Sequence, residues 1–478
     1  MIQPIGATFL CAALWSLVFS PSAHANQLPI LGDSTSGIVS LNEEYKLGSA
    51  WVRTLRAQAP LLEDPLSYSF VNDLLQRLSV YSQLQDRRLS LVVIDDNNLN
   101  AFAVPGGIIG VNSGLFLFSA TESEFASVLA HELSHLSQRH YAQRLAEEQK
   151  SLPLQLATTL AGILLMATTD SQAGMATIMG GQAAAVERSL AFSRANEQEA
   201  DRVGMQVLVD SGYNPSAMPK MFAQLQRSSN NLGSKTPEFL LTHPVTESRI
   251  ADALNRSTQL PKNGLINSPM YQIIRTRIQV LAMRNDTAAY QKYTQAVIAE
   301  PSNANRYGLA FSALRSGQIE NAQQQADLLL EKEPNQLSFH LLQAELWLAA
   351  GESTRASKLL QKLLELYPNN HPITMLLANA YHQQQAHQQV AELLQRHSRY
   401  YPNEIQLWYQ LAEARGLIND IKGVHLARAE YFLLIGAVAK AKEQLERALK
   451  QPGIRDHEKL LIEQRLKYTD EVRKSLHQ

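Results

Sequence analysis

The pattern of hydrophobic and polar positions predicts helices around a small β-region in the first third of the chain. Hydrophobic residues recur every three or four positions over Leu41–Ala59 and Pro65–Tyr81, which predicts two amphipathic helices. Leu89–Asp96 is a run of mostly hydrophobic, β-branched residues and predicts a strand. A second β-rich stretch, residues 100–111, contains a Pro-Gly-Gly break and therefore predicts an edge strand or a hairpin.

The segment before that break has two interpretations. An edge strand next to a metal-binding helix could hold an extended peptide by main-chain hydrogen bonds, which makes the segment a candidate substrate strand. An ordinary core hairpin explains the same composition equally well. The candidate residues are Ala101, Phe102, Ala103 and Val104.

One longer helix is predicted over Thr121–Lys150. Thr121 and Glu124 form a capping-box pattern at its start. The hydrophobic residues that follow recur at helical spacing, and neither proline nor glycine occurs before Pro153. This predicted helix contains the sequence His131-Glu132-Leu133-Ser134-His135.

That sequence is typical of a zinc site. Residues four apart on a helix share a face, so His131 and His135 point the same way, with Glu132 beside them. Two neutral imidazoles at this spacing can bind one zinc ion, and the carboxylate can take a proton from a zinc-bound water. The alternative is a helix whose two histidines are solvated or bonded to the backbone. A zinc site with two histidines also needs a third protein ligand.

A second helix offers candidates for that ligand. The stretch Ser193–Asp201 begins or continues a helix that ends near Gly212. Glu197 and Asp201 are four apart and share a face, so Glu197 is the predicted ligand and Asp201 a carboxylate that supports a ligand or handles a proton. Glu199 is the competing ligand. Taken alone, such an acidic pair is most often a solvated helix face.

Two other histidines and one arginine are candidates for further site residues. His140 lies about half a turn from the face of His131 on a continuous helix, which makes it a poor ligand and favours a supporting or packed position. His243 lies in a predicted loop, where it could occupy the open zinc position, donate to the transition state or be merely structural. Arg249 could pair with a carboxylate or polarise a carbonyl.

The segment Leu152–Gly181 is rich in alanine, glycine, leucine and methionine and carries a single charge, Asp170. Pro153 and a Gly-Gly pair interrupt it. It is predicted to form a helical hairpin or flap near the active site that touches a membrane or an apolar substrate. A transmembrane helix is the weaker alternative.

Composition and the N-terminus then indicate size and compartment. The chain has 478 residues, of which 45% are hydrophobic, which indicates two or more domains. Its net charge of −1 gives no electrostatic case for nucleic-acid binding. Residues 1–25 have the pattern of a secretory signal, with cleavage expected after Ala25. The single cysteine, Cys11, lies inside that segment, so an exported chain without cysteines fits a bacterial periplasm.

The second half of the chain contains an internal repeat. After a predicted linker from Gln259 to Pro269, prolines recur at intervals of 33, 34 and 34 residues, at Pro301, Pro334, Pro368 and Pro402. A period of 34 residues is the signature of tetratricopeptide repeats, which are stacked helix pairs with a concave binding face. Five or six pairs are expected. Gln383–Gln385 stands where the third repeat would have its glycine, so an irregular turn is expected there.

These motifs together resemble a known family. HELSH, then NEQEAD, then THPVTESRI, preceded by NAFAVPGG, is similar to the HtpX-like and CAAX-prenyl-protease-like zinc metallopeptidases. The resemblance implies that His131, His135 and Glu197 bind zinc, that Glu132 is the general base, and that Asp201 assists. Membrane-spanning members of the family carry long apolar helices that this chain lacks.

The resulting prediction is a mainly α (α+β) protein with one zinc ion per chain. Residues 1–25 are the signal peptide, 26–265 a zincin-type metallopeptidase domain with a small β-sheet, and 266–478 an α-solenoid of tetratricopeptide repeats. The resemblance implies a periplasmic endopeptidase with a chaperone-like role, which degrades misassembled outer-membrane β-barrel proteins and assists their assembly.

The predicted partners are unfolded outer-membrane proteins and, through the repeats, the β-barrel assembly machinery, with peripheral membrane contact through residues 152–181 and no nucleic acid. Two rival functions use the same residues differently. One is a repeat scaffold or chaperone whose peptidase domain is silent, and the other is a membrane-embedded protease.

Overall fold

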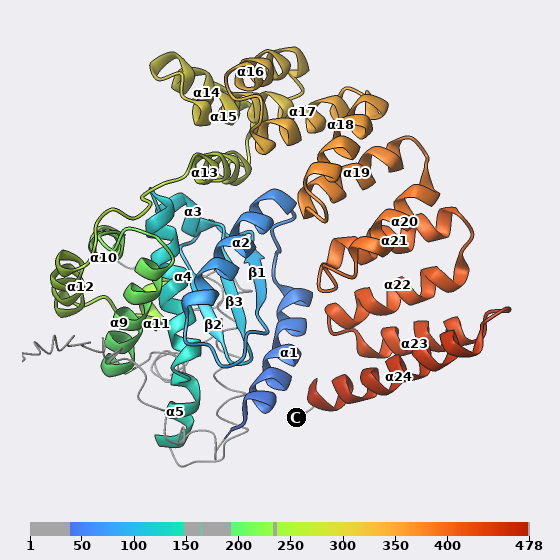
Figure 1. Ribbon diagram of the computed structural model, residues 1–478, viewed down its shortest axis with the longest axis horizontal. Helices are drawn as coiled ribbons and strands as arrows, with labels where there is room; N and C mark the ends of the chain where they lie inside the picture. The colour runs from blue at the N-terminus through green and yellow to red at the C-terminus, as the bar shows by residue number, and fades with distance from the viewer. Residues whose placement is uncertain (1–38, 148–163, 165–192, 233–236, 477–478) are drawn as a thin grey trace, which may run out of the picture.

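The computed structural model describes residues 39–147, 164, 193–232 and 237–476 (Figure 1). The predicted signal segment lies outside these residues, as does the predicted flap at 152–181 apart from Leu164. No helix within the described ranges is long and apolar enough to cross a membrane.

The first unit is built around a three-stranded sheet. Its strands are β1 (Ser90–Ile94), β2 (Ala101–Val104) and β3 (Ile108–Asn112). They lie in the order β1-β3-β2, with β1 parallel and β2 antiparallel to the central strand β3. The segment Ala101–Val104 is therefore both an edge strand and one arm of a hairpin, which confirms the structural part of that prediction. Helices α1 (Leu41–Gln58) and α2 (Pro65–Tyr81) precede the sheet as predicted.

The predicted helix over 121–150 is broken in two, which corrects the sequence-based prediction. The capping box of Thr121 and Glu124 begins α4 (Glu122–Ser137), and α5 (His140–Glu147) follows after a sharp turn. Arg139 makes that turn with a backbone φ of 53°, in the left-handed region that non-glycine residues seldom adopt. Neither proline nor glycine marks this break, so propensity alone could not place it.

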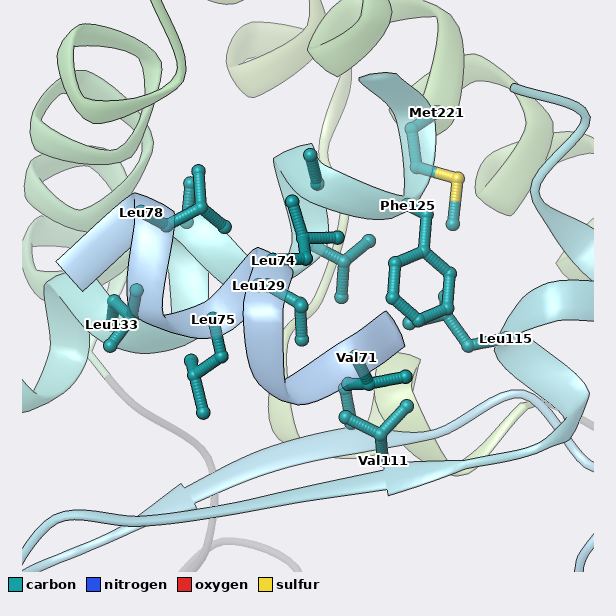
Figure 2. Close-up of a cluster of buried hydrophobic side chains, with 14 of the residues drawn as sticks. Val71, Leu74, Leu75, Leu78, Val111, Leu115, Phe125, Leu129, Leu133 and Met221 are labelled. Atoms are coloured by element: carbon teal, nitrogen blue, oxygen red, sulfur yellow. The ribbon is translucent and has the colours of Figure 1, made fainter. Parts of the chain in front are cut away.

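Helix α4 is the centre of the first unit. Every residue from Glu122 to His135 is buried, because α2, the sheet and three later helices surround it. Figure 2 shows leucines of α2 facing Phe125, Leu129 and Leu133 of α4 across the core. The remaining helices of this unit are α3 (Gly114–Phe118), α9 (Arg194–Asp210), α10 (Ala217–Leu232), α11 (Glu238–Thr242) and α12 (Glu247–Gln259).

The second unit consists of six helix pairs in the described part of the chain. They are α13 (Pro269–Ala282), α14 (Asp286–Ala299), α15 (Asn303–Arg315), α16 (Ile319–Lys332), α17 (Leu337–Ala349), α18 (Ser353–Leu366), α19 (His371–Gln383), α20 (His387–His397), α21 (Ile405–Leu417), α22 (Ile421–Leu434), α23 (Val438–Leu449) and α24 (Asp456–Leu476).

The turns inside these pairs keep one backbone conformation where the sequence changes. Gly317 and Gly351 have φ values of 76° and 78°, and Gln385 and Asn419, each 34 residues further on, have 58° and 60°. The irregular turn expected at Gln383–Gln385 is therefore wrong: glutamine adopts the left-handed conformation of the glycines it replaces. Packing of the flanking helices outweighs the local preference of the residue.

The repeats curve around α1 and α2 of the first unit (Figure 1). Helix α13 joins the two units, because Tyr271, Ile274 and Ile278 belong to the core of the first and Ile273 and Val280 to the core of the repeats. At the other end, α24 packs on α1, where Arg53 donates a hydrogen bond of 2.7 Å to Tyr468. The array is thus held against the first unit near both of its ends.

Candidate metal centre

Two helices bring the predicted ligands together. α4 carries His131, Glu132 and His135, and α9 packs along it with Glu197 and Asp201 facing them. Gly204 allows the close approach of the two helices, since a Cβ there would lie only 3.1 Å from the carbonyl oxygen of Ala130.

Four buried side chains converge on one point. One ligand atom from each of His131, His135, Glu197 and His243 lies within 4.8 Å of all the others. The Nε2 atoms of the two α4 histidines are 3.1 Å apart, and His243 Nδ1 lies 2.9 Å from Glu197 Oε1. His243 follows directly after α11 and caps its C-terminus. Glu199, the competing ligand, is not in this group, because its carboxylate lies 3.3 Å from His140 Nε2 instead.

The carboxylates of Glu197 and Asp201 favour a positive charge at this point. Burial disfavours the charge on His131, yet Asp201 and Glu197 outweigh it and raise the pKa of this imidazole to about 9. Burial lowers the pKa of His135 well below its usual range and raises that of Glu132. Both carboxylate oxygens of Glu132 are buried and have no hydrogen-bond partner among the described residues. Three imidazoles and a carboxylate facing one point are a donor set that fits a metal ion.

Asp201 and Arg249 lie behind the ligands. Asp201 Oδ1 lies 3.0 Å from His131 Nδ1, on the side of the ring that faces away from the centre. Arg249 donates from Nε and Nη2 to the two oxygens of Asp201, both at 2.7 Å, and its Nη1 lies 2.7 Å from Glu197 Oε2. Arg249 therefore pairs with carboxylates, which was one of its two predicted roles.

The edge strand β2 passes close to Glu132. The carbonyl of Asn100 accepts a hydrogen bond from the amide of Asn112, so this end of the hairpin is paired at Asn100. Because backbone groups alternate along a strand, the amides and carbonyls of Ala101 and Ala103 point away from β3. The amide of Ala103 faces the Glu132 carboxylate and lowers its pKa, though less than burial raises it.

His140 is the residue whose place the sequence did not predict. The turn at Arg139 brings its Nδ1 to 2.9 Å from His135 Nδ1, although a continuous helix would have carried it to another face. It stays outside the four converging ligand atoms, as expected of a supporting residue.

Comparisons with known proteins identify relatives of both units. Residues 66–257 match Peptidase family M48, and residues 348–414 match a tetratricopeptide repeat. The chain is 35% identical over 339 residues to the β-barrel assembly-enhancing protease of Escherichia coli (strain K12), covering 70% of this chain and 68% of that protein. The protein of the same name from Yersinia pestis is 35% identical over 333 residues, covering 69% and 68%.

A more distant relative is also a metalloendopeptidase. The mitochondrial metalloendopeptidase of Saccharomyces cerevisiae is 28% identical over 257 residues, covering 50% of this chain and 70% of that protein. Membership of a metallopeptidase family implies a metal ion, and the buried histidines and glutamate provide a group that could bind it. The chain therefore belongs to peptidase family M48 and is a metalloendopeptidase with a tetratricopeptide-repeat array.

Proposed function

We propose that this protein is a periplasmic zinc endopeptidase that acts on unfolded or misassembled outer-membrane β-barrel proteins. His131, His135 and Glu197 would hold one zinc ion, which three nitrogen or oxygen ligands and an open position suit. The observation that carries the proposal is the convergence of these ligand atoms next to the buried carboxylate of Glu132.

Each side chain then has a defined task in peptide hydrolysis. A bound zinc ion would polarise the scissile carbonyl and the attacking water. Glu132 takes a proton from that water and passes it to the leaving amine, and burial favours this by raising the pKa of its carboxyl group. Asp201 keeps His131 oriented, and Arg249 balances the charge of Asp201 and Glu197.

The first experiment separates chemistry from metal binding. Glu132→Gln should keep one zinc ion per chain in elemental analysis yet cleave an unfolded β-barrel protein at least 100-fold more slowly. Glu247→Gln, an exposed change on α12, is the control and should cleave like the parent. Parent-like cleavage by Glu132→Gln would overturn the assignment of the base.

His243 supports a resting state in which the centre is closed. Its Nδ1 faces Glu197, and its Nε2 lies 3.4 Å from Glu132 Oε1, so its ring occupies space between ligand and base that an attacking water needs. We propose that His243 acts as a fourth ligand and leaves when substrate binds. His243→Ala should then raise cleavage several-fold without loss of zinc, and a lower rate would instead indicate a direct role in the transition state.

The outward edge of β2 supports recognition of unfolded strands. The outward amide and carbonyl of Ala101 and the outward carbonyl of Ala103 can pair with an extended peptide, and β-barrel proteins that have not folded expose such segments. The named activity of the similar proteins from E. coli and Y. pestis, β-barrel assembly enhancement, agrees with this substrate class.

Proline substitution tests this pairing. Ala101→Pro removes one outward amide while the pairing of β2 with β3 uses the other face of the strand, so cleavage of an unfolded polypeptide should fall about tenfold or more. Ala101→Gly keeps the amide and serves as the control. If both variants unfold at the parent temperature and cleave equally, strand addition at this edge is ruled out.

The scaffold function remains the second candidate, and the closed geometry around His243 favours it over other rivals. In cells that lack the protein, Glu132→Gln decides between the two. Restoration of every phenotype by this variant would favour a repeat chaperone with a silent peptidase, whereas loss of substrate turnover supports the protease.

Export and docking complete the proposal. The N-terminal pattern supports secretion with cleavage after Ala25, which N-terminal sequencing of a periplasmic fraction tests. The curved repeat array supports docking of the β-barrel assembly machinery, and residues 152–181 support contact with a membrane surface. Co-purification with and without the repeats, and release from membranes by salt, test these two contacts.

A further inference from the structure

The turn after α4 places a second histidine behind one of the metal-facing histidines. His140 Nδ1 lies 2.9 Å from His135 Nδ1, and the other nitrogen of His140, Nε2, lies 3.3 Å from Glu199 Oε2. His140 is fully buried, whereas Glu199 reaches the surface with 41% of its side chain exposed. A chain of three polar side chains thus runs from the centre to solvent.

The protons on this chain have one consistent arrangement. His135 turns Nε2 towards Glu197 and His131, so this nitrogen must be unprotonated to bind a metal ion. Its proton then sits on Nδ1, which donates to Nδ1 of His140. His140 in turn carries its own proton on Nε2, which donates to the carboxylate of Glu199.

The backbone turn that makes this contact is held by the first helix. Arg139 is only 6% exposed, and its guanidinium binds Glu44 of α1 at 2.8 Å and the carbonyl of Val39. A left-handed backbone at a non-glycine residue is costly unless its surroundings fix it, and the contacts with Glu44 and Val39 do so here. A continuous helix would have carried His140 away from His135.

We propose that His140 and Glu199 are positioning residues of the metal centre, which hold His135 with Nε2 directed at the metal ion. The inference rests on the proposed role of His135 as a ligand. Asp201 contacts Nδ1 of His131, just as His140 contacts Nδ1 of His135. Each of the two histidine ligands therefore has a partner on the ring nitrogen that does not face the metal ion. Partners of this kind fix the tautomer and orientation of a ligand and raise its affinity for the metal ion.

Two substitutions separate the hydrogen bond from the packing. His140→Phe keeps a ring of similar size and removes the acceptor, whereas His140→Gln keeps an acceptor. We expect His140→Phe to bind zinc 10- to 100-fold more weakly than the parent in competition with a chelator, and His140→Gln to recover part of that loss. Glu199→Gln keeps an acceptor without the charge and should lose affinity by a few-fold. His457→Gln, an exposed change on α24, is the control.

A spectroscopic readout is independent of activity and of overall fold. In ¹⁵N-histidine spectra of the zinc-loaded parent, His135 should show a protonated Nδ1 and His140 a protonated Nε2. His140→Phe should change the His135 Nδ1 signal but not that of His131. Thermal unfolding of the metal-free variants identifies any that fail to fold. If the His140 variants do not fold, the zinc affinity of Glu199→Gln tests the same chain of contacts with His140 intact.

An error in the zinc site and an error in the positioning role would give different results. If His135→Ala binds zinc as tightly as the parent, the proposed zinc site itself is wrong. If His135→Ala loses zinc but folded His140→Phe binds it with parent affinity, the site stands and the positioning role of His140 is overturned. A protonated Nε2 on His135 in the zinc-loaded parent would overturn it as well.

Discussion

Arg249 is the residue on which the charge balance of the centre depends. It makes an ion pair with Glu197, two hydrogen bonds to Asp201 and one to the carbonyl of Pro244, and it is 3% exposed. A planar guanidinium can make these contacts at once, while an ammonium group carries the same charge on a single nitrogen. Replacing Arg249 by lysine therefore keeps the positive charge and removes the planar shape that makes these contacts.

We expect Arg249→Lys to weaken both the fold and the metal site. Losing part of a buried, charged hydrogen-bond network should lower the free energy of unfolding by about 2 kcal/mol, and zinc affinity should fall because Asp201 no longer holds His131 as firmly. Chemical denaturation and chelator competition measure the two effects. Arg256→Lys, in an exposed ion pair with Asp252 on the same helix, should change neither. Equal behaviour of both variants would contradict this role.

Glu238, the first residue of α11, should make the stability of the folded chain depend on pH. His243 lies at the other end of the same helix. Glu238 is buried, accepts a hydrogen bond from Asn100 and faces Asp96. Burial, with Asp96 adding to it, raises the pKa of Glu238 to about 7 from 4.5. The folded chain therefore holds this proton after the unfolded chain has released it, so stability is lost as pH rises from 4.5 to 7 and no further loss follows above 7.

Glu238→Gln should remove that loss. The variant and the parent should unfold at similar temperatures near pH 4.5, and the variant should become the more stable one towards pH 7, by at most roughly 3 kcal/mol. Melting temperatures at half-unit steps from pH 4 to 8 measure the difference. A constant difference across this range would show that Glu238 is ionised in the folded chain.

The sequence predicted much of this centre because its main ligands lie on two helices at fixed spacing. The i, i+4 spacing put His131 and His135 on one helix face and Glu197 and Asp201 on another, and the upstream His-Glu motif favoured Glu197 as a ligand over a solvated helix face. The place of His140 could not be predicted, because it depends on a left-handed arginine held by Glu44, almost 100 residues earlier in the chain. The local sequence pattern could not predict this helix break, because a contact with a residue far away in the chain stabilises it.

At the scale of elements, spacing predicted the repeats better than residue type predicted their turns. The 34-residue period located the helix pairs, and Gly317 and Gly351 located two left-handed turns. Gln385 adopts the same conformation without the glycine that normally signals it. Its strain is borne by the packing of α19 and α20, which residue preferences do not include.

Gln385→Gly should therefore stabilise the array. Relief of a left-handed non-glycine backbone contributes on the order of 1 kcal/mol to the free energy of unfolding. Gly351→Ala is the reverse change at the matching turn one repeat earlier, where an added Cβ meets no atom within 4 Å, so a loss of about 1 kcal/mol would come from the backbone alone. Chemical denaturation measures the free energy of unfolding of both variants. Changes of the same sign in the two variants would contradict the explanation.

At the scale of the whole molecule, one arginine joins the two units. Arg277 on α13 binds Asp64 at the start of α2 at 2.8 Å and Glu345 on α17 at 2.7 Å, and its Nη1 donates to the hydroxyl of Tyr307 at 3.0 Å. The arginine is 6% exposed and Asp64 is 5% exposed. Arg277 opposes burial and, with Ser67, holds the pKa of Asp64 below its usual value. Peptidase and repeats thus share a buried ionic contact as well as the apolar core along α13.

Arg277→Met tests whether that contact makes the two units unfold together. The change leaves the buried Asp64 and the partly buried Glu345 without their cation, which should cost about 3–5 kcal/mol and separate unfolding into two transitions. Adding Asp64→Asn and Glu345→Gln to Arg277→Met removes the stranded charges and should recover most of the loss. Arg315→Met, which breaks a half-exposed pair with Asp286, should cost less than about 1 kcal/mol. A single transition in Arg277→Met, at the parent temperature, would mean that the apolar packing of α13 couples the units without help from the ionic contact.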